Sequence, residues 1–244
     1  SLFFKNEKID FKDFKLIIIC AFFGMGLNMI TALNGLYNST PINSAIITTL
    51  APIFIFIISV FLLKEKITKI KYLGVFIGFI GTLTLILLNE KSIANAPNIN
   101  LGNFYFFINS LSYAIYFVLV KPLTKKYSMI TIMKWLFLFS IIINMPFGLL
   151  EFTEINWAEI SRNSLIKISY VVFCTTFLVY LLNLYALKNL KASTVGMFIY
   201  LQPVIGILFA IYRGADKLTI ADISSVIMVF AGVYLVSKRS TQIT

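Results

Sequence analysis

Hydrophobic residues fall into eight long blocks along this chain, and short polar segments separate the blocks. Each block is long enough to cross a hydrocarbon layer about 30 Å thick as an α-helix, which rises about 1.5 Å per residue. None of the blocks carries the polar face that a surface helix of a soluble protein presents to water. The pattern therefore predicts eight transmembrane helices, over Leu16–Tyr37, Ile42–Leu63, Ile70–Leu88, Leu101–Val120, Thr131–Leu150, Ile166–Leu187, Thr194–Tyr212 and Ile220–Val236.

The composition supports a membrane protein. The mean hydropathy is +0.90, and 59% of the residues are hydrophobic. This exceeds what a soluble domain of the same length needs to build its core. We therefore expect an all-α polytopic membrane protein rather than a soluble domain.

The distribution of charge predicts how the helices are oriented. The net charge is +11, which in a soluble protein would suggest a nucleic-acid partner. Most of the 21 lysine and arginine residues, however, lie in the segments that alternating helices place on the same side as residue 1. By the positive-inside rule, these segments and both termini are cytoplasmic. The expected partners of the basic residues are anionic lipid headgroups and not nucleic acid.

The first 90 residues recur 151 positions later, in hydropathy and in several identities. Positions of different chemical type pair at this constant offset, as in Pro52 with Pro203, Gly81 with Gly232 and Lys66 with Lys217. A fixed offset shared by such positions is typical of an internal repeat. We expect a first repeat over residues 1–90, a linker over 91–100 and a second repeat over 101–239.

Connecting segments at equivalent positions of the two repeats differ in charge. The lysine-rich segment 64–71 aligns with 215–222, which contains two aspartates. Equivalent segments therefore face opposite sides of the membrane, as in an inverted-topology repeat. The counterparts of the blocks Leu101–Val120 and Thr131–Leu150 would precede residue 1. We therefore expect two further helices upstream, roughly 50 to 60 residues, which gives five helices per repeat.

Two stretches resemble the repeat of EamA-type permeases, a branch of the drug/metabolite transporter superfamily. In residues 31–87 the resemblance lies in the small-residue turn Asn38–Asn43, the Ala51-Pro52 pair and the acidic helix exit at Glu65. Residues 184–236 depart from the pattern at Gln202, which replaces the alanine before proline, and at the exit Arg213–Asp216. The resemblance implies a ten-helix exporter or facilitator of the bacterial inner membrane with a central cavity, of which this chain lacks the first two helices.

Several kinds of chemistry have no candidate residues in this sequence. No Asp, Glu, Lys or Arg occupies the middle of any block, and the chain contains no histidine. A charge at the bilayer centre costs at least about 2.5–3.5 kcal/mol, so charges placed there usually mark ion or proton sites. The P-loop motif that binds ATP is absent as well. We expect no metal site, no cofactor and no catalytic residues, and hence a transporter rather than an enzyme.

Neutral polar residues remain as candidates for a substrate path. Asn109, Tyr113 and Tyr116 fall at i, i+4 and i+7, which is one helix face, and the same spacing recurs in Thr176, Tyr180 and Asn183. The alternative is that these side chains only form hydrogen bonds between helices, worth about 0.6 kcal/mol each. The predicted path residues are Asn28, Thr49, Asn109, Tyr113, Thr176, Tyr180, Tyr200 and Gln202.

Pro52 and Pro203 lie at equivalent positions in the middle of their blocks. Each proline removes a helix hydrogen bond, so each is a candidate hinge that lets one half of the molecule rock. The alternative is a kink that serves packing alone.

These features predict a secondary transporter of small neutral, zwitterionic or amphiphilic metabolites, such as amino acids or drugs, that works by alternating access. A strongly anionic substrate would need arginine or lysine at membrane depth. Two alternatives stay open: a proton-coupled antiporter with its titratable group in the upstream helices, and a membrane enzyme acting on lipid-linked substrates. A homodimer is also left open.

Overall fold

The computed structural model describes residues 7–39, 41–65, 68–88, 97–202, 204–205, 212 and 220–237. Within these ranges the chain is helical and contains no strand, which confirms the prediction of an all-α polytopic membrane protein. Five of the described helical stretches are long and apolar enough to cross a membrane: Phe11–Asn38, Asn43–Leu63, Ile99–Lys126, Met129–Leu149 and Arg162–Asn189.

The first predicted block forms one continuous helical rod with an irregular centre. It consists of α1 (Phe11–Ala21), the π-helical segment η1 (Phe22–Leu27) and α2 (Asn28–Asn38). A π-helical hydrogen bond spans one residue more than an α-helical one, so the side chains that follow the segment are rotated relative to those before it.

The second block is interrupted before its proline. Helix α3 (Pro41–Thr48) ends and α4 (Leu50–Leu63) begins on either side of Thr49. Pro52 has no N–H to donate, and its ring collides with the carbonyl group four residues earlier, at Thr48. The position of the break therefore follows directly from the proline.

The next three helices are long. They are α5 (Lys69–Leu88), α6 (Ile99–Lys126) and α7 (Met129–Glu154). Two of them begin at capping side chains, since the Asn98 side chain accepts a hydrogen bond from the Leu101 N–H and the Ser128 hydroxyl accepts one from the Thr131 N–H. The short 3₁₀ turn η2 (Trp157–Glu159) follows α7.

The second rod repeats the design of the first. It consists of α8 (Arg162–Tyr170), the π-helical segment η3 (Val171–Leu178) and α9 (Val179–Asn189). Then come α10 (Ala192–Met197), the 3₁₀ turn η4 (Phe198–Tyr200) and, as the last helix of the described residues, α12 (Ile220–Ser237).

Element boundaries recur at the offset of 151 residues. Helix α8 begins 151 positions after α1, α10 begins 151 positions after α3, and α12 begins 151 positions after α5. The two π-helical segments also end at equivalent residues, Leu27 and Leu178. The irregular turn is therefore a shared feature of both halves.

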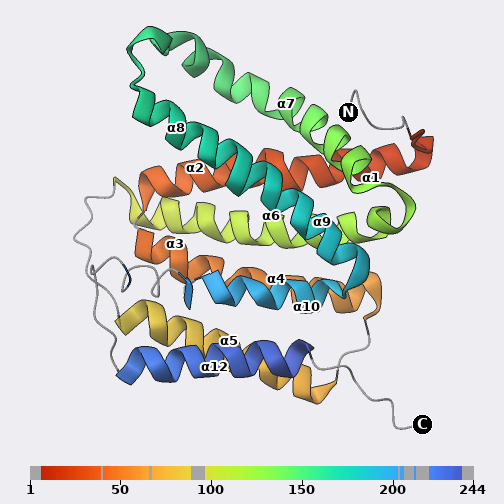
Figure 1. The fold of residues 1–244 in the computed structure, drawn as a ribbon, viewed down its shortest axis with the longest axis vertical. Coiled ribbons are helices and arrows are strands. Elements are labelled where there is room, and N and C mark those ends of the chain that lie inside the picture. Colours follow the sequence, from red (N-terminus) through yellow and green to blue (C-terminus); the bar gives the residue numbers. More distant parts are fainter. Residues whose placement is uncertain are drawn as a thin grey trace.

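Helices α5 and α12 pack side by side along their length (Figure 1). A Cβ atom on Gly81 would lie 3.0 Å from the Ser225 carbonyl oxygen and 3.1 Å from the Val229 nitrogen. A Cβ on Gly232, the partner of Gly81 at the offset of 151, would meet the backbone of Gly74 and Gly78, which are the partners of Ser225 and Val229. Each contact of α5 with α12 therefore has a counterpart in which the roles of the two helices are exchanged. Two antiparallel helices related by a two-fold axis have this pattern, so the two halves are inverted relative to each other.

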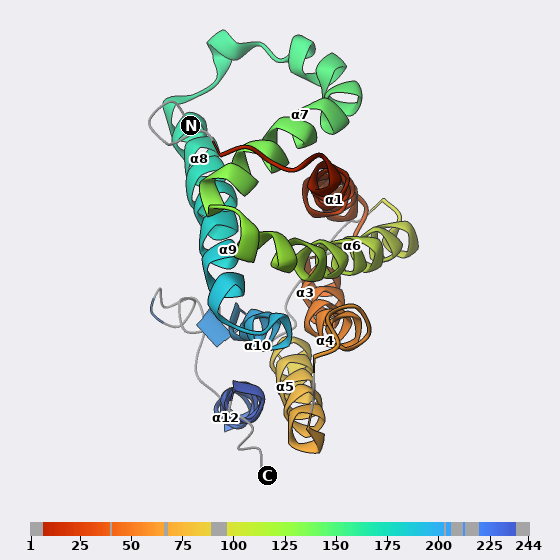
Figure 2. The same cartoon turned by 90° about the vertical axis from the view of Figure 1, so that its right-hand side faces the viewer.

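The helices lie roughly side by side, with α5 and α12 at one end of the row and α7 and α8 at the other (Figures 1 and 2). Helix α6 is central and packs against the first rod, α3, α4 and α9. A large apolar core surrounds α6, and a smaller one joins α4, α5, η4 and α12. Because the chain alternates direction, the start of α1, the ends of α4 and α6 and the start of α10 all lie on the same side of the row, the right-hand side in Figure 1, which we call the lysine-rich end.

Candidate functional site

Four of the predicted path residues meet around the irregular centre of the first rod. Asn28, Asn109, Tyr113 and Tyr180 come from α2, α6 and α9. Asn28 and Asn109 bond to each other, Tyr180 bonds to the backbone of η1, and Tyr113 contacts Asn183 of α9 and the Tyr116 ring. Together with their neighbours they form what we call the central polar cluster, which consists of Gly24, Asn28, Asn109, Tyr113, Tyr116, Asn144, Tyr180 and Asn183.

Asn28 and Asn109 bind each other's backbone. The Asn28 amide donates to the Asn109 carbonyl oxygen at 3.2 Å, and the Asn109 amide donates to the Asn28 carbonyl oxygen at 2.7 Å. The two bonds fix the depth at which α2 crosses α6. Both side chains remain half-buried.

Tyrosine side chains link α6 to α9. The Asn183 amide donates to the Tyr113 hydroxyl at 3.0 Å, and the rings of Tyr116 and Tyr180 lie with centroids 5.6 Å apart. The Tyr180 hydroxyl donates a short hydrogen bond to the Gly24 carbonyl oxygen of η1. The two predicted stripes on these helices therefore face each other in this part of the structure.

Side chains of three other helices satisfy the carbonyl groups of η1. The Phe23 oxygen accepts from the Ser112 hydroxyl at 2.6 Å, the Gly24 oxygen from Tyr180, and the Met25 oxygen from the Asn144 amide at 3.4 Å. Inside a membrane, backbone groups released by an irregular turn need such partners because water is absent. The π-helical segment is thus held by α6, α7 and α9 together.

A glycine permits the close approach on which this arrangement depends. A Cβ atom on Gly24 would lie 2.5 Å from the Tyr116 ring. Only glycine therefore allows the tyrosine ring to lie flat against η1.

Two polar atoms in the central polar cluster are buried and have no hydrogen-bond partner among the described residues. They are the Tyr116 hydroxyl and the Asn144 side-chain oxygen. Buried polar groups are nearly always paired, and an unpaired one is costly in an apolar environment. These atoms are therefore candidates for binding a polar group of a ligand: the amide oxygen accepts a hydrogen bond, and the hydroxyl can donate or accept one.

The remaining predicted path residues lie elsewhere. Thr176 belongs to η3, where its hydroxyl donates to the Val171 carbonyl oxygen of its own helix at 3.1 Å. Thr49 is buried at the break between α3 and α4. Tyr200 is buried in the smaller core, where its ring would meet a Cβ atom on Gly78 at 3.0 Å. Gln202 is exposed, and the hinge candidate Pro203 lies outside the described residues.

The sequence patterns missed Ser112, Asn144 and the π-helical segments. Ser112 lies on the same helix as Asn109 but does not fall at the i, i+4, i+7 spacing of the predicted stripe, and Asn144 lies on α7, for which no stripe was predicted. The π-helical segments were missed because the spacing rule assumed a regular helix throughout. The only local sign of η1 is the pair Gly24 and Gly26.

Two acidic residues near the N-terminus, Glu7 and Asp13, make contacts at the lysine-rich end. The Asp13 carboxylate accepts hydrogen bonds from Lys126 at 2.9 Å and from the Tyr127 hydroxyl at 2.7 Å. Glu7 accepts one from the Ser128 N–H at 2.8 Å, and this bond lowers the pKa of the Glu7 carboxyl. Among the described residues, no group of three or more His, Cys, Asp or Glu side chains is placed to hold a metal ion.

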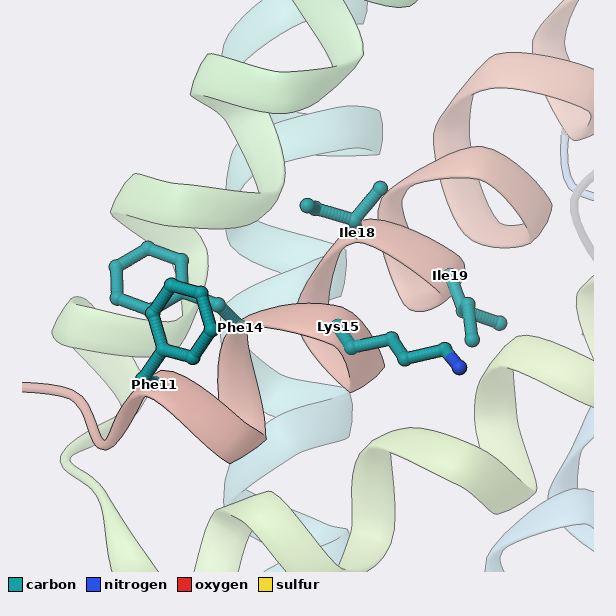
Figure 3. Close-up of a pocket in the computed structure, with 5 residues that line it drawn as sticks. All are labelled: Phe11, Phe14, Lys15, Ile18 and Ile19. Carbon is teal, nitrogen blue, oxygen red and sulfur yellow. The ribbon is translucent and has the colours of Figure 1, made fainter.

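A groove on α1 is separate from the central polar cluster. It is lined by Phe11, Phe14, Lys15, Ile18 and Ile19, which all belong to that one helix (Figure 3). Its walls are almost entirely apolar, which suits lipid chains better than a polar ligand. We therefore place the candidate site at the cluster and not at this groove.

Comparison with known proteins agrees with this architecture. A transporter of Archaeoglobus fulgidus is 28% identical over 96% of this chain and 81% of its own length. The transporter YetK of Bacillus subtilis is 25% identical over 82% of this chain and 60% of its own length, and the relative YyaM of the same organism is 24% identical over 85% of this chain and 70% of its own length. None of the three has a characterised substrate in its name.

One protein of known crystal structure shares the fold. It superposes with a TM-score of 0.76 at 13% sequence identity and covers 94% of this chain and 77% of its own chain. The sequence profile of the EamA-like transporter family matches residues 1–87 and 100–238, which correspond to the two halves described above. The chain is therefore an integral membrane protein that belongs to the EamA-like transporter family.

Proposed function

We propose that this protein is a secondary transporter of small neutral, zwitterionic or amphiphilic metabolites that works by alternating access between its two inverted halves. The observation that carries the proposal is the central polar cluster, in which two buried polar atoms have no partner among the described residues. The cluster contacts helices of both repeats, so a substrate bound there would touch both halves.

The chemistry of the cluster side chains supports this substrate class. They are amides, phenols and aromatic rings, with no ionised group among them. Amides and hydroxyls bind neutral polar groups, and tyrosine rings favour apolar, aromatic or ammonium groups. An amino acid or a small amphiphilic amine has both kinds of group.

The irregular helices supply places at which each half can bend. The first rod has its π-helical turn at η1, and the second has the equivalent turn at η3. The break before Pro52 at Thr49 and the 3₁₀ turn η4 before Pro203 are also equivalent at the offset of 151. Discontinuous helices of this kind recur at the binding sites of secondary transporters built from inverted repeats.

The proposal is tested by uptake into proteoliposomes that contain the full-length protein. A panel of labelled amino acids, aromatic amines and organic anions is offered, and the proposal expects uptake of the neutral, zwitterionic or amphiphilic compounds. Tyr116→Phe and Asn144→Leu should each raise the apparent KM about tenfold, because each removes one hydrogen bond to a buried ligand group. Ser164→Ala, which alters an exposed hydroxyl of α8 that contacts the capping residue Ser161, is the control.

Two results would contradict the proposal. Uptake restricted to anions would place the substrate outside the predicted class. Unchanged kinetics in both cluster variants would place the substrate path elsewhere.

A further inference from the structure

The carboxylate of Glu65 joins the two halves at the lysine-rich end. Glu65 follows α4, where Lys64 adopts a left-handed conformation with φ of 50° and turns the chain out of the helix. This turn directs the Glu65 side chain away from its own repeat and toward the start of α10, in the other repeat.

Glu65 caps α10. One carboxylate oxygen accepts from the Ala192 N–H at 2.9 Å, and the other accepts from the Ser193 N–H at 3.4 Å and the Ser193 hydroxyl at 2.6 Å. The first N–H groups of a helix have no partner inside the helix, and a carboxylate stabilises them well. The local residue before α10, Lys191, forms no side-chain capping bond of its own. The capping group for this helix therefore comes from the opposite half.

Lys121 completes the contact. Its ammonium group lies 3.5 Å from the Glu65 carboxylate and also donates a short hydrogen bond to the Leu190 carbonyl oxygen, just after α9. The side chains of Lys121 and Glu65 are only 13% and 6% exposed. One buried ion pair thus connects the end of α4, the end of α6 and the turn between α9 and α10.

We propose that Glu65 is a positioning residue for transport, which keeps the lysine-rich end closed by holding α10 against α4 and α6. The inference rests on the proposed function, because alternating access requires this end to open. Helix α10 leads through η4 to Tyr200, so release of the Glu65 contact frees the segment that forms the smaller core. A buried ion pair is suited to such a switch, since its geometry is either intact or broken.

The experiment measures access to α10 independently of transport. Cys20 is replaced by alanine and Cys174 by serine, so that the protein contains no other thiol. A single reporter cysteine is then placed at Met197, at the end of α10, or at Leu136 of α7, in the large apolar core; both positions are buried. Labelling by N-ethylmaleimide is timed in the full-length protein in lipid nanodiscs. Glu65→Gln should raise the labelling rate at Met197→Cys about tenfold by shifting the population toward the open state, with little change at Leu136→Cys.

Two further variants distinguish loss of the Glu65 contact from general effects of a substitution. Ser193→Ala removes one of the contacts without touching a charge and should raise the rate at Met197→Cys about threefold, even if Glu65→Gln folds poorly. Glu159→Gln alters an exposed carboxylate whose partner is the nearby Asn156, and should leave both rates unchanged. Equal acceleration at both reporters would mean general loosening and would overturn the proposal, as would no acceleration at Met197→Cys.

Uptake measured on the same variants separates this inference from the proposed function. A lower maximal rate for Glu65→Gln with an unchanged apparent KM supports the positioning role. If the wild type moves no substrate but Glu65→Gln still exposes Met197→Cys selectively, the closing contact stands and the proposed function fails. If the wild type transports substrate and Glu65→Gln has the same uptake rate and the same labelling rate, the positioning role of Glu65 is wrong and the proposed function is unaffected.

Discussion

At the scale of single residues, the first rod depends on glycine as much as on its hydrogen-bonding side chains. The Tyr116 ring lies against Gly24, and the Ile143 side chain occupies the space beside Gly26. Each glycine admits a large side chain of a neighbouring helix close to the backbone of η1. Close approach and carbonyl capping are therefore parts of the same contact.

Gly24→Ala should destabilise the protein by about 1–3 kcal/mol, because the added methyl group would lie 2.5 Å from a buried aromatic ring. The matched control is Gly148→Ala in α7, where a Cβ atom would meet nothing within 4 Å. That control should be neutral or stabilising by up to about 1 kcal/mol, through its higher helix propensity. Thermal unfolding in detergent compares the two. A lower midpoint for Gly148→Ala than for Gly24→Ala would contradict the packing of η1.

Glu7 provides a test by pH at the lysine-rich end. The Ser128 N–H lowers the pKa of its carboxyl below the ordinary value of 4.5, so the charged form is favoured in the folded protein. The stabilisation is therefore present above the ordinary pKa and is lost as pH falls through the folded value. Because Glu7 is exposed, we expect less than about 0.5 kcal/mol. The difference in unfolding midpoint between wild type and Glu7→Gln should be small at pH 7 and shrink as the pH is lowered below 4.5. A difference that grows in acid would contradict this.

At the scale of helices, the irregular turns are what set this fold apart from a bundle of straight rods. The break at Thr49 has a local cause in Pro52, whereas η1 is held by side chains of α6, α7 and α9. An irregular turn with a local cause persists when its neighbours move. One held by its neighbours can shift with them, which suits a part of the molecule that rearranges.

Pro52→Ala tests the hinge at the scale of the helix. Removing the proline should let α3 and α4 join into one helix, which would preserve or raise stability while slowing transport about tenfold. Pro146→Ala is the control, because Pro146 lies on the exposed side of α7, which continues through it. Initial uptake rates and unfolding midpoints are measured together. Equal uptake by wild type and Pro52→Ala would mean that Pro52 is a kink that serves packing alone and is not a hinge.

At the scale of the whole molecule, the pseudo-two-fold axis between α5 and α12 makes equivalent substitutions comparable. Gly81→Val and Gly232→Val should lower the unfolding midpoint by similar amounts, since each places a side chain against the backbone of the facing helix. The double variant should cost less than the sum, because one displacement of the helices relieves both contacts. A large difference between the single variants would mean that the two halves do not pack symmetrically.

The family and the helical architecture were both accessible from the sequence. Insertion of a helix depends on the hydropathy of about 20 consecutive residues, so the blocks were found without knowledge of their neighbours. The break at Thr49 was also accessible from the sequence, because a proline disrupts the helix only in the turn that precedes it. The pairing of Asn183 with Tyr113 was only half visible, since spacing shows which residues share a face but not what that face meets.

By itself the sequence determined the family and the all-α polytopic architecture, and it predicts the 151-residue repeat, because hydropathy, charge and proline act over short distances along the chain. Only the tertiary structure decided what lies between the helices. The hydrogen bonds to the η1 carbonyls and the capping of α10 by Glu65 join residues far apart in sequence, and the Tyr116 hydroxyl and the Asn144 side-chain oxygen are buried without a partner within the described part of the chain. Such contacts depend on the depth and rotation of each helix, and a single π-helical turn changes that rotation without leaving a mark in the hydropathy pattern.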